Sequence, residues 1–262
     1  MDRTTKTLRD RVLEHLQILR IPITPDEVDH VLKAVDHEHL SVLAAFDRLL
    51  GEQAARRRDR AIQRRVTAAK FAGQKTLQTF EWTFNKTINR LQYEQLATGD
   101  FIRRHINVVL VGQSGVGKSH LMQAVGLSAC AVGYRVFYTT SSQLLMRLTA
   151  ALADKSLTET LRWYANWDAL IVDEFGLDRI EREECPHAAH LLYKVIVSRH
   201  HKRSTILISN IDFDAWATYL GDAPLATAML DRLVDGAVVI KIKGPSYRAS
   251  RSGSPLAPPT PS

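Results

Sequence analysis

Apolar residues follow two different periodicities along the chain, and the change between them divides it into two parts. Over about the first 50 residues, apolar side chains recur every three or four positions with charged residues between them, as in amphipathic helices. From about residue 106 onward, short runs of consecutive apolar residues alternate with segments of helical spacing. Such alternation is typical of a parallel α/β sheet. The pattern therefore predicts a small helical domain followed by an α/β domain.

Three amphipathic helices are predicted in the N-terminal part, and we expect them to form a small bundle. The apolar face of the first helix consists of Leu8, Val12, Leu16 and Leu19. Thr24, Pro25 and Glu27 form a start signal for the second helix, because a threonine cap, a proline in the first turn and a glutamate three residues after the cap favour helix initiation. Its buried residues are expected to be Val28, Val31, Leu32 and Val35. Ser41 is expected to cap the third helix, which continues into an arginine-rich stretch.

Five apolar runs predict the strands of the α/β domain. They are Val108–Val111, Val136–Thr139, Asp168–Asp173, Ser204–Ser209 and Val238–Ile242. The segments between them have helical spacing, and Ser141 is expected to cap one of these helices. Because neighbouring parallel strands need a crossover connection, this order predicts a parallel sheet covered by helices.

An aromatic segment connects the two parts of the chain. Phe80, Trp82 and Phe84 alternate as in an extended segment, and the spacing from Asn89 to Phe101 predicts one helix. Aromatic side chains most often pack in a core, so core packing is the favoured interpretation. In the alternative, part of this segment forms the base-binding wall of a nucleotide pocket.

A glycine-rich loop between the first strand and the next helix is the strongest signal in the sequence. The loop reads Gly112-Gln-Ser-Gly-Val-Gly-Lys118-Ser119. Its glycines allow backbone N–H groups to point at phosphate oxygens, Lys118 adds a positive charge, and Ser119 supplies a hydroxyl ligand for Mg²⁺. The alternative is a glycine-rich turn that matches by chance, and the strand before the loop and the helix after it argue against this. The residues assigned to nucleotide binding are Gly112, Gln113, Ser114, Gly115, Val116, Gly117, Lys118, Ser119 and His120.

Polar residues follow two further predicted strands. Asp173 and Glu174 end an apolar run, and Asn210 follows another. Because functional residues of parallel sheets gather at the carboxyl ends of strands, these three are expected to lie beside the phosphate loop. Asp173 would hold Mg²⁺, Glu174 would act as general base towards water, and Asn210 would contact the γ-phosphate or that water. The alternative for Asn210 is a turn former or helix cap.

Arg232 follows the apolar face of a predicted helix. It is a candidate for an arginine that completes the nucleotide site of a neighbouring subunit, so it is grouped with Lys118, Asp173, Glu174 and Asn210 as a catalytic candidate. The alternative is a surface arginine paired with Asp231 or Asp235.

Basic residues are concentrated in the N-terminal part. Of the net charge of +7, the first 105 residues contribute +5, and the stretch from Glu52 to Lys75 has eight basic residues against two acidic ones. The candidates for DNA binding are Arg56, Arg57, Arg58, Arg60, Arg64, Arg65 and Lys70. No zinc-finger, helix-turn-helix or RNA-binding signature accompanies them, so any nucleic-acid contact is expected to be to the backbone, without sequence preference. A solvated charged face is the alternative.

The remaining composition indicates an intracellular protein. Cys130 and Cys185 lie far apart and outside any metal-binding pattern, so reduced thiols are expected. No signal peptide precedes the first helix and no run reaches the about 20 apolar residues of a membrane helix, which predicts a cytoplasmic protein without membrane contact. From residue 249 the chain is rich in serine and proline, and residues 249–262 are expected to be a disordered tail.

Taken together, these motifs resemble the IstB family of insertion-sequence transposition helpers, which belongs to the AAA+ ATPases and is related to the helicase loader DnaC and the initiator DnaA. The resemblance runs from about Thr7 to Arg248 and rests on motifs that occur in a fixed order. They are Ala68-Ala-Lys-Phe71, Lys75-Thr-Leu-Gln-Thr-Phe80, Gly112–Ser119, Ile171-Val-Asp-Glu174, Ile208-Ser-Asn210, Leu230-Asp-Arg-Leu233 and Gly244-Pro-Ser-Tyr-Arg248.

The resemblance implies a P-loop AAA+ core with a five-stranded parallel sheet of order 5-1-4-3-2 and no C-terminal lid, preceded by the helical bundle. It implies ATP and Mg²⁺ as cofactors, oligomerisation on double-stranded DNA, and a partner transposase that the assembly recruits and stimulates. It supports Arg232 as the arginine acting on a neighbouring subunit and adds Arg248 as a nucleotide contact. The expected domains are 1–68 (helical, DNA binding and assembly), 69–105 (linker), 106–248 (ATPase) and 249–262 (tail).

Two other functions are compatible with the same motifs. A DnaC-like loader would dock its N-terminal bundle on a replicative helicase, and the arginine-rich helix argues against it because such docking needs no phosphate-directed face. A non-enzymatic adaptor would bind ATP without hydrolysing it, and the pair Asp173-Glu174 together with Asn210 argues against that.

Overall fold

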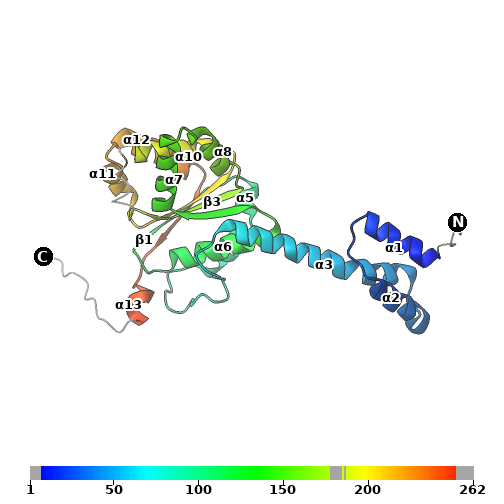
Figure 1. Ribbon diagram of the computed structural model, residues 1–262. Coiled ribbons are helices and arrows are strands. Elements are labelled where there is room, and N and C mark those ends of the chain that lie inside the picture. The colour runs from blue at the N-terminus through cyan, green and yellow to red at the C-terminus, as the bar shows by residue number, and fades with distance from the viewer. Residues whose placement is uncertain (1–6, 178–184, 186, 252–262) are drawn as a thin grey trace. The chain divides into compact units, whose positions relative to one another are not determined.

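The computed structural model describes residues 7–177, 185 and 187–251, and it contains two compact units (Figure 1). The first unit comprises residues 1–64 and the second residues 65–262. The boundary falls inside helix α3 (Val42–Ala69), four residues before the predicted end of the helical domain at residue 68.

The first unit is built from the three predicted helices, α1 (Leu8–Ile18), α2 (Pro25–Glu38) and the first part of α3. Both α1 and α2 begin with a capping box, formed by Thr7 with Asp10 and by Thr24 with Glu27. Ser41 accepts a hydrogen bond from the backbone N of Ala44 at 3.2 Å, as a residue that caps α3 should. The local start signals in the sequence therefore decide where these helices begin.

The core of the first unit is smaller than the periodicity predicts. Leu16, Ile23 and Val28 form it, and Val31 and Ala34 are also buried. The prediction that Leu32 and Val35 are buried is wrong, because Leu32 is exposed and Val35 is only half-buried. On the apolar face of α1, Leu8, Val12 and Leu19 are also exposed. A bundle this small does not enclose both sides of its helices.

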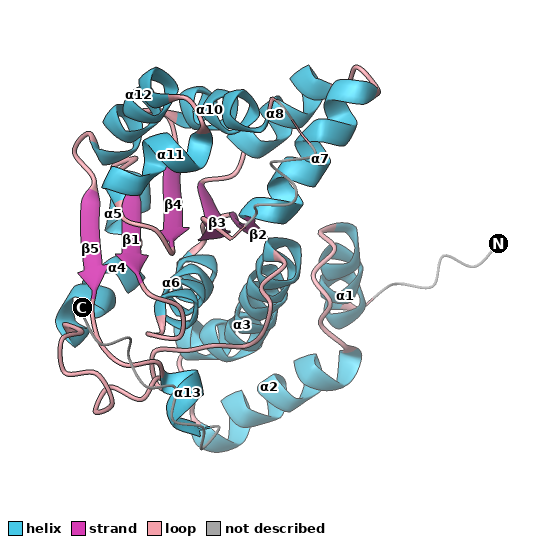
Figure 2. Cartoon of the chain, turned by 90° about the vertical axis from the view of Figure 1, so that its left-hand side faces the viewer, coloured by secondary structure: helices cyan, strands magenta, loops and turns pink. Residues whose placement is uncertain are grey.

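The second unit contains a five-stranded parallel sheet with the order β2-β3-β4-β1-β5, which confirms the predicted topology (Figure 2). The strands are β1 (Val108–Gly112), β2 (Val136–Thr140), β3 (Ala169–Phe175), β4 (Ser204–Ser209) and β5 (Val238–Ile242). Because all the strands are parallel, their carboxyl ends lie along one edge of the sheet.

Helices cover both faces of the sheet (Figures 1 and 2). One face packs against α4 (Arg90–Ala97) and α6 (Lys118–Val132), with side chains such as Leu110 and Ile171 in its core. The other face carries Val109 and Val172 and packs against helices that follow later in the chain. They are α7 (Ser141–Ala153), α8 (Leu157–Ala165), α10 (Ala188–Arg199), α11 (Trp216–Leu220) and α12 (Ala223–Val234). Neighbouring residues of a strand thus enter different cores, as strand geometry requires.

Several local predictions are corrected by the structure. The single helix expected over residues 89–101 is two helices, α4 and α5 (Asp100–Arg103), because Gly99 adopts a left-handed conformation with φ of 76°. Thr140 rather than Ser141 caps α7, and its side chain accepts from the backbone N of Gln143. The aromatic segment around Trp82 forms turns instead of an extended stretch.

The C-terminal end of the described chain is helical. A short helix, η1 (Phe213–Ala215), precedes α11, and α13 (Tyr247–Arg251) follows β5. Helix α13 extends three residues into the segment expected to be a disordered tail, and residues 252–262 lie outside the described residues. Within the described ranges, no helix is both long and apolar enough to cross a membrane.

Candidate functional site

The glycine-rich loop connects the end of β1 to the start of α6 at the carboxyl edge of the sheet, as predicted. Gly115 and Gly117 both have positive φ angles, 86° and 98°. A Cβ atom at Gly115 would lie 2.0 Å from the Ser246 hydroxyl, and one at Gly117 would lie 2.8 Å from the Phe80 ring. Both positions therefore require glycine for backbone conformation and for space.

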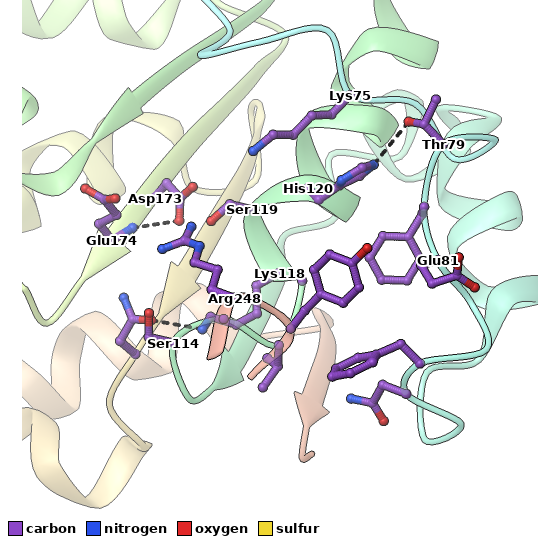
Figure 3. A pocket seen from close by; sticks show the side chains of 18 of the residues that line it. Lys75, Thr79, Glu81, Ser114, Lys118, Ser119, His120, Asp173, Glu174 and Arg248 are labelled. Atoms are coloured by element: carbon purple, nitrogen blue, oxygen red, sulfur yellow. Dashed lines mark hydrogen bonds between the residues drawn. The ribbon is translucent and has the colours of Figure 1, made fainter. Parts of the chain in front are cut away.

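Lys118 is buried at the centre of the loop, with 4% of its surface exposed. Its ammonium group donates to the carbonyl oxygens of Gly112 (2.6 Å) and Gln113 (2.8 Å) and to Oδ1 of Asn210 (2.9 Å; Figure 3). These three acceptors match the three protons of an ammonium group. The predicted meeting of the loop with the end of β4 is thus a direct hydrogen bond.

The buried ammonium group has a perturbed pKa. Burial lowers the pKa of Lys118 to about 8, the negative charge of Asp173 acts to raise it, and the positive charge of Arg248 lowers it. A cavity that disfavours the charged lysine on its own will favour it once phosphate oxygens are bound.

We expect nucleotide affinity to fall as pH rises above about 8. Above that pH the free Lys118 is neutral and must take up a proton to bind an anion, so affinity should approach a tenfold loss per pH unit. A phosphate monoester loses its last proton at about pH 6, so the nucleotide itself does not titrate in this range. Calorimetric titrations between pH 7 and 9.5, in buffers of different ionisation enthalpy, measure both the affinity and the proton uptake. Constant affinity across that range would contradict the prediction.

Asp173 and Glu174 at the end of β3 differ in environment. Asp173 is 1% exposed, and its Oδ1 accepts a hydrogen bond from the backbone N of Glu174 at 2.8 Å. Glu174 is exposed and has a φ of 61°, where the register between β3 and β4 shifts. The backbone therefore buries the aspartate and turns the glutamate outward. Both residues line the same pocket as Ser119 (Figure 3).

The oxygen atoms of Ser119 and Asp173 suit a hard divalent cation such as Mg²⁺, which prefers oxygen ligands. Both side chains face the cavity that also contains the glycine-rich loop and Lys118. The residues present therefore fit a nucleotide with its magnesium ion, and the metal-binding assignment of Ser119 and Asp173 stays a prediction.

Two segments from outside the loop form the remaining walls of a cavity of about 350 Å³. From the C-terminal side, Tyr247 donates its backbone N to the carbonyl oxygen of Gly115 at 3.0 Å, and Arg248 lines the pocket as the resemblance implies. From the linker, Asn85 Nδ2 donates to the carbonyl oxygen of Lys243 at 2.9 Å. The linker and the C-terminal segment are thus joined to each other over the loop.

The aromatic segment contacts both the core and the pocket. Phe80 and Phe84 line the pocket, Phe80 also packs against the core of the α6 face, and the base-binding role considered from the sequence stays a prediction. Trp82 packs against the core of the α6 face and donates its indole N–H to the carbonyl oxygen of Leu77 at 3.0 Å. The linker, the segment after β3 and helix α13 contribute further pocket residues that were not assigned from the sequence. They are Lys75, Thr79, Glu81, Asn85, Leu177 and Tyr247.

The predicted nucleotide-binding residues separate into two groups. Those that line the pocket are Ser114, Gly115, Val116, Gly117, Lys118, Ser119, His120 and Arg248. Gly112 and Gln113 lie beneath it and contribute carbonyl oxygens to Lys118. His120 is fixed from the linker side, where its Nε2 lies 3.0 Å from the carbonyl oxygen of Thr76.

Arg232 does not line the pocket of its own chain. It is half-buried on α12, donates to the carbonyl oxygen of Ala228 at 3.0 Å, and lies over the Tyr193 ring at 5.2 Å. In the described part of the chain it forms no ion pair with Asp231 or Asp235, and Asp235 pairs with His201 at 3.2 Å instead. Arg232 therefore does not form the ion pair with a neighbouring aspartate that was its alternative interpretation.

The arginine-rich stretch of α3 is solvent-exposed over most of its length. The exposed members of the predicted set are Arg56, Arg57, Arg58, Arg60, Arg64 and Lys70. Arg56 pairs with Glu52 and lies 3.5 Å from Glu27, so carboxylates already neutralise it. Arg65 is half-buried and donates to the carbonyl oxygen of Cys130 at 2.9 Å within the second unit, which leaves it less exposed than the other members of the set.

Comparisons with known proteins place the chain in a family. A family model described as IstB-like ATP binding protein matches residues 6–254. The chain is 31% identical over 241 residues to an ATP-binding protein of insertion sequence IS5376 from Geobacillus stearothermophilus, an alignment that covers 92% of this chain and 94% of that protein. It is 38% identical over 192 residues to an ATP-binding protein of insertion sequence IS21 from Pseudomonas aeruginosa, with 73% and 71% covered.

Solved structures support the fold. A crystal structure of DnaI matches with a TM-score of 0.53 at 18% identity, covering 65% of this chain and 92% of that chain. Domain III of DnaA from Thermotoga maritima matches with a TM-score of 0.50 at 19% identity, covering 68% of this chain and 70% of that chain. At these identities the similarity shows a shared fold alone. Because the family model spans nearly the whole sequence, the chain belongs to the family of IstB-like ATP binding proteins.

Proposed function

We propose that this protein is a magnesium-dependent ATPase that oligomerises on duplex DNA and recruits and stimulates the transposase of its insertion sequence. The observation that carries the proposal is one pocket in which the glycine-rich loop, Lys118, Asp173, Glu174 and Asn210 meet. The relatives that match most of the chain are named as ATP-binding proteins of insertion sequences, which supports the role in transposition.

Within the pocket, the residues take separate tasks. The loop and Lys118 hold the phosphates, and Ser119 and Asp173 hold the magnesium ion, which neutralises negative charge on the phosphates when it is bound. Glu174 is an exposed carboxylate that lines the pocket at the end of β3, and it accepts a proton from the attacking water. Asn210 accepts a hydrogen bond from Lys118 and so helps to orient the groups at the phosphate end of the site.

The base of the nucleotide contacts the aromatic wall. Phe80 and Phe84 from the linker and Tyr247 from α13 line the pocket together, and the Phe84 and Tyr247 rings pack edge to face at 5.0 Å. Aromatic faces of this kind stack with a purine without reading its edge in detail.

Arg232 acts on a neighbouring subunit in this proposal. Its position outside its own pocket, with its guanidinium group only half-buried, supports a role that another copy of the chain completes. Oligomerisation and turnover are then linked, because a single chain lacks one charge of its active site.

Exposed arginines of α3 provide the DNA contacts. Arg57, Arg60 and Arg64 fall within about 60° of one another around the helix, at 3.6 residues per turn, and they form no ion pair with the described residues. Guanidinium groups on one face suit a row of phosphates.

Replacing Arg57, Arg60 and Arg64 by alanine should weaken binding to duplex DNA to a similar extent for every sequence. The plot of log affinity against log salt has a negative slope, and each lost phosphate contact reduces its magnitude by about 0.9. The plot for the triple variant should therefore be shallower by about 2 to 3. Fluorescence anisotropy of labelled duplexes at several salt concentrations, with and without ATP, measures both quantities.

The matched control replaces Arg11, Arg20 and Lys33 by alanine, which removes the same charge from exposed positions elsewhere in the first unit. An equal effect of both triple variants would mean that net charge, and not this helix face, attracts DNA. A wild-type protein that binds and assembles on single-stranded DNA only would favour the helicase-loader function over the proposed one.

A further inference from the structure

Tyr138 on β2 contacts the carboxylate of Asp173, which lies on the neighbouring strand β3. Its hydroxyl donates to Oδ2 of Asp173 at 2.8 Å. In the parallel pairing of β2 with β3, Tyr138 lies opposite Ile171 and Thr140 opposite Asp173, so tyrosine and aspartate project to the same face of the sheet. Tyr138 is 8% exposed and does not line the pocket, so it reaches the aspartate from the protein side.

The two oxygen atoms of Asp173 are held by two different donors. Oδ1 accepts from the backbone N of Glu174 and Oδ2 accepts from Tyr138, both at 2.8 Å. A carboxylate held at both oxygens cannot rotate without losing one hydrogen bond. Donors behind a metal ligand orient it, and their loss commonly weakens metal binding about 10- to 100-fold.

The tyrosine is itself fixed by its neighbours. Its ring packs against Phe71 at 6.4 Å, and Phe71 in turn fills the space beside Gly126, where a Cβ atom would lie 2.9 Å from the phenylalanine ring. The packing of its ring therefore holds the tyrosine hydroxyl in a fixed position beside Asp173.

We propose that Tyr138 is a positioning residue for the divalent cation: it sets the orientation of the Asp173 carboxylate and touches neither nucleotide nor metal. The inference rests on the proposed function, because it assumes that Asp173 holds a magnesium ion beside the bound nucleotide.

The test is Tyr138→Phe in the full chain, which removes one hydroxyl and keeps the ring. Affinity for a fluorescent ATP analogue without divalent cation should stay within about twofold of wild type, since Tyr138 lies outside the pocket. Mn²⁺ binding in the presence of a non-hydrolysable ATP analogue is measured by electron paramagnetic resonance. The free Mn²⁺ concentration needed for half-saturation should rise about tenfold or more.

Tyr93→Phe is the matched control. Tyr93 is fully buried in the same core, and its hydroxyl has no hydrogen-bond partner among the described residues, so its removal should leave the Mn²⁺ titration unchanged. An unchanged titration in Tyr138→Phe, with wild-type protein binding nucleotide normally, would overturn this inference and leave the proposed function intact. Wild-type protein that binds no nucleotide would instead overturn the proposed function.

A double-mutant comparison keeps the test informative if Tyr138→Phe loses stability. In an Asp173→Asn background there is no carboxylate to orient, so adding Tyr138→Phe should not change the residual Mn²⁺ affinity further. A further tenfold loss in that background would show that the tyrosine acts through general packing, and the inference would be wrong.

Discussion

Lys118→Ala is expected to abolish measurable ATP binding while the protein stays folded. The variant removes a charged donor whose three hydrogen bonds show that it lies at the centre of the loop. Hydrogen bonds to charged groups contribute about 1.5–3 kcal/mol each, so losing one or two bonds to phosphate weakens binding by about one to four orders of magnitude. Because burial lowers the pKa of Lys118, its charge is unfavourable in the free protein, which offsets part of the loss of its three hydrogen bonds, so the alanine variant should stay folded.

Thermal denaturation with and without ATP checks both parts of this expectation. Wild-type protein should gain stability from the nucleotide, and the variant should show the same transition with or without it. Lys202→Ala, at an exposed position outside the pocket, is the control and should keep the full shift. Nucleotide-induced stabilisation that survives in Lys118→Ala would remove the loop from the proposed function.

Glu174→Gln should retain ATP binding and assembly on DNA but turn over ATP about 100-fold more slowly or worse, the usual effect of losing a general base. The amide keeps the size of the side chain and does not change the demand of the left-handed backbone at φ 61°. It cannot accept the proton from water. Phosphate release under saturating ATP and DNA, together with nucleotide affinity, separates binding from catalysis.

Glu81→Gln is the matched control for this variant, because Glu81 is another glutamate that lines the same pocket, on the linker side. It should keep most of the turnover. Equal losses in the two variants would mean that the electrostatics of the pocket as a whole, and not proton transfer at Glu174, limit the reaction.

The sheet and the edge that carries the pocket were predictable because they depend on short-range signals. A run of apolar residues that ends in a polar one marks both a buried strand and its carboxyl end, which is why Asp173 and Asn210 could be expected beside the loop. The bond between Lys118 and Asn210 joins residues 92 positions apart, yet strand order alone brings them together.

Other features depend on packing that no local pattern contains. The α1 periodicity predicts a buried stripe, but how much of it is covered depends on what a three-helix unit can enclose, and Leu8 stays 69% exposed. In the sequence, Tyr138 looks like any other residue of an apolar strand. Its contact with Asp173 depends on the pairing of β2 with β3, in which Thr140, two residues after Tyr138, lies opposite Asp173.

The linker was the most ambiguous segment from sequence. Aromatic residues there were compatible with a core and with a nucleotide pocket, and in the structure Phe80 and Trp82 pack against the core while Phe80 and Phe84 line the pocket. A signal was present in the motif Lys75–Phe80, which is particular to the family resemblance and lies far from the strands.

The joined linker and C-terminal segment determine how short a working fragment of this protein can be. The motifs by which the site is recognised span only residues 112–210, but Lys75 at one end and Arg248 at the other both line the cavity. Asn85 and Lys243 hold these ends together. A fragment cut to the motifs would keep the loop and lose two of its walls, so residues 75–248 are the least that can enclose a nucleotide.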